Sequence, residues 1–189
     1  MVNGHYTTFR RRSALVSFLA VSCLWLASSV AAQNPSDYFD PHSRQLLFNL
    51  KRNHLDPGLR ELERKQLGEA QADVDFILRY VPNHVEGLAL NEEIAKTRKL
   101  PEMALASYVT ALQLYPGHAI THVQFGAFLL DLGRVDAAID SLNAAVRLDR
   151  QLALAHSYLA KAYRRNGDTQ KAAAEEAEAQ KLSGRGGGR

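Results

Sequence analysis

The histidines are the residues of this sequence whose types and spacing come closest to supporting chemistry. His118 and His122 are four positions apart, so on one helix their imidazoles could bind the same metal ion. His84 and His156 would lie on neighbouring helical hairpins. No Asp or Glu is close to His118 and His122 in sequence to complete a ligand set. We therefore predict no metal site, and a His-based metal-binding module stays as an alternative.

Other arrangements of catalytic groups are missing from the sequence. It contains no Gly-rich phosphate loop, no Gly-x-Ser-x-Gly and no His-Glu-x-x-His. Glu175, Glu176 and Glu178 cluster in an alanine-rich stretch, which is typical of a solvated helix face. We predict a protein without catalytic residues and without a cofactor.

The elements that would position these side chains repeat every 34 residues. Alanines, turn glycines and histidines recur at that spacing: Gly133 and Gly167, Ala138 and Ala172, Ala145 and Ala179, His122 and His156. One period earlier stand Ala104 and Ala111, and Pro82 precedes Pro116 by the same distance. A period in this size range is typical of a solenoid of stacked repeats.

Within one repeat the apolar positions follow a helical period twice. In residues 117–150 a first helix carries Phe125 and Leu129, and a second carries Leu142. Gly133 lies between them and can adopt the positive φ that ends a helix. Each repeat therefore predicts a helical hairpin, and stacked hairpins bury surface that one hairpin cannot.

On these residues the chain resembles the tetratricopeptide repeat family. The resemblance rests on small residues in both helices, on aromatic positions and on residues at the helix ends, namely Gly126, Ala160, Tyr163, Tyr108, Ala104, Ala138, Ala172, Ala111, Ala145, Ala179, Pro82 and Pro116. It implies an all-α fold, a right-handed superhelical solenoid of stacked antiparallel helix hairpins. The family position of His122 and His156 usually holds an aromatic residue, so packing is the simpler interpretation of both.

The predicted domain organisation follows from the repeat. It comprises a signal peptide (1–32), an N-terminal lead segment and helix (33–54), a degenerate repeat (55–82), three repeats (83–116, 117–150 and 151–184) and a flexible tail (185–189). Pro57 predicts a break or kink after a helix over about 43–55. Lys99 replaces the turn glycine, which predicts a looser or shifted hairpin. Glu176 predicts a last helix that faces water and caps the stack.

The resemblance also implies where a partner binds. Ligands of the family lie in a concave groove lined by the first helix of each hairpin; the matching positions are Ile120, Val123, Ala127, Leu130, Leu154, Ser157, Lys161, Arg164 and Arg165. These residues are apolar in the middle and basic at the C-terminal end, which favours an extended or helical peptide with apolar and acidic residues. The alternative is that the apolar members pack on the next hairpin. The asparagines of chaperone-binding members are replaced by Glu93, Ala127 and Lys161.

The N-terminus has the pattern of an export signal. Three arginines precede an apolar stretch from Ala14 to about Ala27, and Val30-Ala31-Ala32 fits cleavage before Gln33. Cleavage would remove Cys23, the single cysteine. The alternative is an uncleaved anchor, because residues 13–32 just reach the length that spans a bilayer, and membrane contact is expected only in that case. Lipidation of Cys23 is disfavoured by the residues around it.

Net charge points to no nucleic-acid partner. The formal charge of +3 equals the three arginines of the leader, so residues 33–189 hold equal numbers of basic and acidic side chains. Together these features predict an exported, periplasmic, non-enzymatic scaffold or adaptor for a protein partner of the cell envelope. A membrane-tethered assembly factor for a secretion or envelope complex is the alternative, and self-association is possible.

Overall fold

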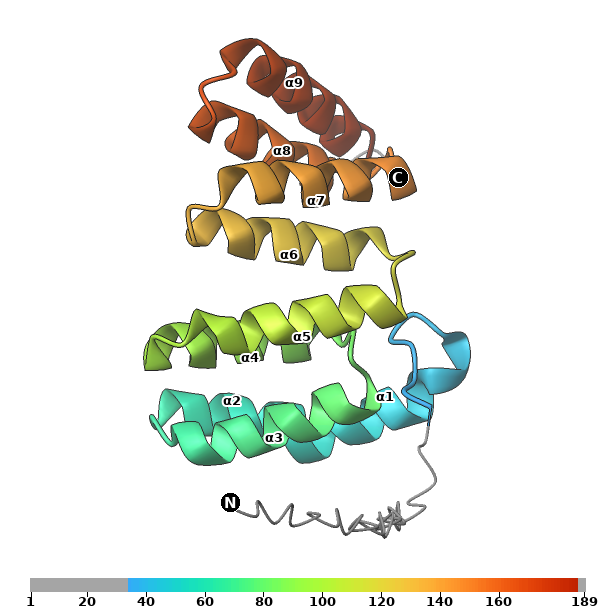
Figure 1. Ribbon diagram of the computed structural model, residues 1–189. Helices are drawn as coiled ribbons and strands as arrows, with labels where there is room; N and C mark the ends of the chain where they lie inside the picture. Colours follow the sequence, from blue (N-terminus) through green and yellow to red (C-terminus); the bar gives the residue numbers. More distant parts are fainter. Residues whose placement is uncertain (1–33, 187–189) are drawn as a thin grey trace, which may run out of the picture. The chain divides into compact units, whose positions relative to one another are not determined.

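The computed structural model describes residues 34–186 of the 189-residue chain (Figure 1). The predicted signal peptide and the last three residues lie outside this range. The described elements are η1 (Pro41–Ser43), α1 (Arg44–Leu50), η2 (Lys51–Leu55), α2 (Asp56–Glu63), α3 (Leu67–Tyr80), α4 (Val85–Arg98), α5 (Pro101–Leu114), α6 (Ala119–Asp131), α7 (Val135–Leu148), α8 (Ala153–Arg165) and α9 (Thr169–Gly186). Every element over residues 34–186 is helical, which confirms the predicted all-α class.

The helices pair as hairpins that stack in chain order. The helical stretch from α1 to α2 pairs with α3, and α4 with α5, α6 with α7 and α8 with α9 follow (Figure 1). Each hairpin packs on the next through contacts such as α3 with α4 and α7 with α8. The solenoid predicted from the 34-residue period is therefore confirmed.

Close helix approach within and between these hairpins depends on glycine at defined positions. A Cβ added at Gly126 would lie 2.6 Å from the Leu142 Cγ, and one at Gly87 would lie 2.8 Å from the Ile77 Cγ2. Both distances are shorter than side chains tolerate, so these two helix pairs pack at a separation that excludes any larger residue.

The turn of the α4–α5 hairpin keeps its register although it lacks glycine. Lys99 adopts a left-handed conformation with φ 58°, as Gly133 does with φ 73° and Gly167 with φ 84°. Of the two predicted alternatives, looser or shifted, the looser hairpin is found, because α4 and α5 contact each other less extensively than α6 and α7. Polar side chains occupy part of their interface: the Asn91 Nδ2 donates to the Ser107 Oγ at 2.9 Å.

Of the predicted break or kink at Pro57, the break is wrong, because the chain stays helical from Arg44 to Glu63. A π-helical turn, Lys51–Leu55, directly precedes α2, and the Asp56 N–H donates to the Lys51 carbonyl, five residues back. Proline lacks an N–H and its ring clashes with the carbonyl four residues before it. The wider π turn accommodates Pro57 without ending the helix. The predicted boundary between residues 54 and 55 thus falls inside a continuous helical stretch.

The C-terminal helix runs further than the sequence suggested. α9 extends to Gly186, beyond the predicted repeat end at residue 184. Arg164 of α8 pairs with Glu176 of α9, at positions that hold Leu130 and Leu142 one repeat earlier. None of the helices in residues 34–186 combines the length and apolar character needed to cross a membrane.

Candidate functional site

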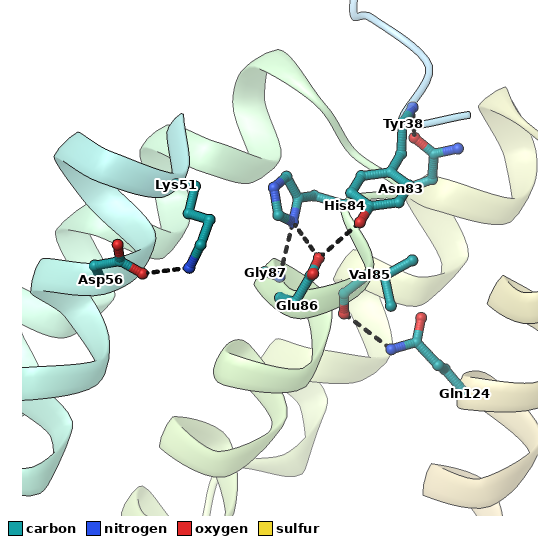
Figure 2. Close-up of polar contacts among 9 residues, drawn as sticks. All are labelled: Tyr38, Lys51, Asp56, Asn83, His84, Val85, Glu86, Gly87 and Gln124. Atoms are coloured by element: carbon teal, nitrogen blue, oxygen red, sulfur yellow. Dashed lines mark hydrogen bonds and ion pairs between the residues drawn. The ribbon is translucent and has the colours of Figure 1, made fainter. Parts of the chain in front are cut away.

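The segment before α1, residues 34–40, is fixed against the loops between hairpins; we call it the lead segment. The Tyr38 amide donates to the Asn83 Oδ1 at 2.9 Å, and the Ser36 amide donates to the Tyr80 carbonyl at 2.7 Å. The Tyr38 hydroxyl donates to the Glu86 Oε2 at 3.0 Å (Figure 2). The lead segment therefore spans the end of α3 and the start of α4.

The lead segment also reaches the start of α6. The Asp37 Oδ2 lies 2.7 Å from the His118 Nε2, and the Asn83 Nδ2 donates to the Asp37 Oδ1 at 2.7 Å. Burial disfavours the charged carboxylate, but hydrogen bonds from Asn83 and the Phe39 amide, with the contact to His118, outweigh it and lower the pKa of Asp37. The Phe39 ring stacks on the His118 ring with centroids 4.4 Å apart.

The histidines considered as metal ligands are held apart by separate partners. His84 caps α4 by accepting from the Gly87 amide at 3.1 Å (Figure 2). The His122 Nε2 lies 3.0 Å from the Pro116 carbonyl, and the His156 Nδ1 lies 2.6 Å from the Glu175 Oε2. Over residues 34–186 there is no group of three or more His, Cys, Asp or Glu that could hold a metal ion. The four imidazoles therefore have individual structural contacts.

Five of the predicted groove residues line one hollow between α6 and α8. It has a volume of about 400 Å³, and we call it the basic hollow; its lining is Ala127, Leu130, Asp131, Tyr158, Lys161, Arg164 and Arg165. Leu154 and Ser157 lie nearby in a hollow of about 370 Å³ between α8 and α9, which shares Lys161 and Arg164. Thus helix periodicity brings the predicted basic side chains together on the exposed face of α8.

Ile120 lines a third hollow, and Val123 lines none of these three. The third hollow has a volume of about 270 Å³, and we call it the apolar hollow; its lining is Phe39, Gly117, His118, Ala119, Ile120, Leu148, Asp149 and Leu152. Val123 is only 1% exposed because it packs in a core cluster with Leu142 and Leu159. The prediction that Val123 lines a partner groove is therefore wrong. Leu130, at 4% exposure, is mainly a core residue as well.

The cations of the basic hollow differ in how they are compensated. Arg164 pairs with the Glu176 carboxylate, whereas the Arg165 guanidinium donates to a neutral acceptor, the Leu130 carbonyl. The Lys161 Nζ lies 4.4 Å from the centroid of the Tyr158 ring. Neither Lys161 nor Arg165 has a carboxylate partner in the described part of the chain.

Asp131, the acidic residue of the basic hollow, is itself compensated. The Lys96 Nζ lies 3.2 Å from the Asp131 Oδ2 and 2.7 Å from the Glu92 Oε1, so one ammonium of α4 links two carboxylates. Burial alone would lower the pKa of Lys96. The contacts with these carboxylates outweigh burial and raise the pKa above its usual value. The hollow therefore keeps an excess of positive charge.

A larger apolar hollow lies elsewhere on the chain, between α5, α6 and α7. It has a volume of about 520 Å³, and we call it the α5–α7 hollow; its lining is Leu105, Val109, Leu112, His122, Phe125, Leu129, Arg134, Ala137, Asp140, Ser141 and Ala144. The sequence did not predict this hollow, because each of its walls looks like an ordinary core-facing helix stripe. Phe39 and Tyr158 were also missed, since neither occupies a groove position of the repeat.

Comparisons with known proteins agree with this architecture. Residues 126–167 match a family model described as TPR repeat. The crystal structure of MamA is similar with a TM-score of 0.58 and 14% identity, over 75% of this chain and 82% of that chain. MamA from Desulfovibrio magneticus RS-1, residues 41 to the end, gives a TM-score of 0.53 and 20% identity, over 67% and 71%.

A third similar structure is YrrB, described as a TPR protein with an unusual peptide-binding site. Its TM-score is 0.52 and its identity 20%, over 66% of this chain and 64% of that chain. At these identities the likeness establishes the fold alone. No curated protein sequence matches the chain.

Proposed function

Because the fold is a stack of helical hairpins and residues 126–167 match a TPR repeat model, we propose that the protein is a non-enzymatic scaffold or adaptor that binds a partner peptide or helix in the groove between α6 and α8. Its fold and its MamA and YrrB neighbours support a protein-interaction scaffold. YrrB is itself described as having a peptide-binding site. Peptide binding by this chain is our proposal.

The observation that carries this proposal is the pair of uncompensated cations in the basic hollow. Lys161 and Arg165 lie beside the apolar Ala127 and Leu130 in a space of about 400 Å³. A carboxylate that entered this space would form charge-assisted hydrogen bonds with both cations while its carbon atoms contacted the apolar wall. An acidic peptide is the ligand whose chemistry fits this combination.

We place the protein in the cell envelope on the strength of residues 1–32, whose arginines, apolar stretch and small terminal residues fit an export signal. With cleavage after Ala32 the scaffold is periplasmic; without it, residues 13–32 would anchor a membrane-tethered assembly factor. The mass of the protein isolated from its native envelope tests this directly. A mass beginning at Gln33 supports the periplasmic form, and an intact N-terminus supports the anchored form.

Capture of the partner tests the groove. The chain from Gln33 onward, immobilised, is exposed to detergent-treated envelope extract beside a Lys161→Glu, Arg165→Glu variant whose circular dichroism matches that of the wild type. Val109→Lys in the α5–α7 hollow is the matched control, because it places a charge on an exposed apolar surface outside the basic hollow. We expect a band retained by the wild type and the control and lost from the double variant. A band kept by the double variant would contradict binding at the basic hollow.

A further inference from the structure

Of the three hollows lined by predicted groove residues, the basic hollow and the apolar hollow both include α6, and a residue outside the repeats forms part of the apolar hollow. Phe39 of the lead segment lines the apolar hollow and is 40% exposed, so its ring is both anchored and available. Ile120 of α6 forms another part of the same hollow. The ring of Phe39 thus extends the apolar surface of α6 beyond the helix itself.

Phe39 is held in place by contacts that order it before any ligand arrives. Its ring stacks on His118 at 4.4 Å and meets the Tyr38 ring edge-on at 5.1 Å. His118 is in turn fixed by the Asp37 carboxylate at 2.7 Å. A prepositioned aromatic ring loses little conformational entropy on binding, which makes it an effective anchor for an apolar side chain.

The two hollows lie along the same stripe of α6. Ile120 and Ala127 are seven residues apart, two helical turns, so they share a face of the helix. Ile120 lines the apolar hollow, and Ala127 with Asp131 lines the basic hollow. At about 1.5 Å per residue, the two hollows are separated by roughly 10 to 16 Å along α6.

We infer that the groove selects an extended peptide in which an apolar side chain and a carboxylate are about three to five residues apart, since an extended chain advances about 3.3 Å per residue. The apolar side chain contacts Phe39 and Ile120, and the carboxylate binds Lys161 and Arg165. This inference rests on the proposed function and makes the lead segment a determinant of specificity. Charge complementarity supports the inference. Asp131 is paired with Lys96 and Arg164 with Glu176, so the positive charges of Lys161 and Arg165 are left for the carboxylate of the peptide.

Selection from a phage-displayed library of random dodecapeptides tests the inference. The chain from Gln33 onward is compared with Phe39→Ala and with Lys161→Ala, Arg165→Ala. Phe48→Ala and Lys51→Ala are matched controls, because both residues are exposed and lie on α1 and η2, away from the groove. Circular dichroism checks that each variant is folded. The selected consensus peptide is then synthesised and its binding measured by fluorescence anisotropy, with a free carboxyl terminus and as the amide.

We expect a consensus with one apolar and one acidic position three to five residues apart. Phe39→Ala should remove the preference for the apolar position. The double variant Lys161→Ala, Arg165→Ala should remove the preference for the acidic position. Each should weaken binding of the consensus peptide about tenfold or more. The peptide amide shows which carboxylate binds. If the amide no longer binds, the ligand is the C-terminal carboxylate; if it still binds, the ligand is an Asp or Glu side chain.

Two outcomes would contradict the inference, and they are distinguishable. A consensus whose two preferences survive in both groove variants would overturn the two-hollow site while leaving peptide binding intact. No enrichment of any peptide over uncoated beads would overturn the proposed function together with the inference.

Discussion

At the scale of single residues, the hairpins depend on where a side chain is missing. Gly126 lies against the Leu142 side chain, and at this point α6 and α7 approach too closely for a methyl group. Gly68 in α3 has the opposite environment, with no heavy atom within 4 Å of an added Cβ. The same residue type is therefore a packing requirement in one helix and only a source of flexibility in another.

Replacing Gly126 by Ala should destabilise the fold by about 1 to 3 kcal/mol, because Leu142 or the backbone of α6 must move to admit the methyl group. The matched change Gly68→Ala should instead stabilise the fold by up to about 1 kcal/mol, since alanine favours a helix and restricts the unfolded chain. Urea unfolding of the wild type and both variants measures the difference. Equal effects of the two substitutions would contradict the packing role of Gly126.

At the scale of elements, helix ends are fixed by side chains that the repeat does not specify. His84 is 2% exposed, and its Nδ1 accepts a hydrogen bond from the Gly87 amide at the start of α4 (Figure 2). The Glu86 Oε2 lies 3.4 Å from the same nitrogen. Burial, only partly opposed by Glu86, lowers the pKa of His84. The capping interaction requires a neutral Nδ1, so cap and protonation state are linked.

This linkage predicts a loss of stability in mild acid. In the unfolded chain His84 binds a proton near pH 6.5, and in the folded chain it binds one only at lower pH. The contribution of neutral His84 to the stability of the fold is therefore present above pH 6.5 and is lost as pH falls through the lowered pKa of the folded chain. Between pH 7.5 and 5.5 the wild type should lose about 1 kcal/mol more than His84→Asn, which keeps a capping oxygen without a titrating group. His84→Ala should be less stable at both pH values. Equal losses by wild type and His84→Asn in urea titrations would refute the linkage.

The sequence predicted the hairpins well and the site only in part, for physical reasons. A 34-residue period identifies core positions such as Ala138 and Ala145, because every hairpin repeats the same contacts. The period could not separate Val123, which the next hairpin buries, from Ala127, which is half-buried and lines the basic hollow from the same helix. It also could not place Phe39, because the lead segment has no periodicity and reaches His118 across 81 positions of sequence.

At the scale of the described chain, residues 34–186, the lead segment links the α4–α5 hairpin to the α6–α7 hairpin, which contact each other weakly. α5 and α6 contact less extensively than α7 and α8, and Asp37 links Asn83 to His118 across this junction. Removing the carboxylate in Asp37→Ala should cost about 1 to 3 kcal/mol and speed amide exchange near Asn83 and His118. Asp40→Ala, which removes a local cap of η1, should leave exchange at the junction unchanged. Hydrogen exchange that is equal in both variants would argue against the bridge.

The last described hairpin, α8 and α9, has a polar outer face at positions where the preceding hairpin is apolar. Leu130 and Leu142, both buried, become Arg164 and Glu176 one repeat later, and the two charges pair with each other. The variant Arg164→Leu, Glu176→Leu restores the apolar pair without a following hairpin to cover it. We expect its weight-average mass to rise with concentration in sedimentation equilibrium, because the new surface can bury itself only against another molecule.

The matched control for the end of the stack is Lys51→Leu, Asp56→Leu, which replaces another exposed ion pair, with the Nζ and Oδ1 2.6 Å apart, by two leucines (Figure 2). Both double variants add the same apolar side chains, but only the pair on α8 and α9 takes repeat positions whose leucines are buried one hairpin earlier. The control should therefore associate less than the α8–α9 variant at equal concentration. If both associated equally, the polar face of α8 and α9 would be a general solubility feature and would not act as a cap of the hairpins before it.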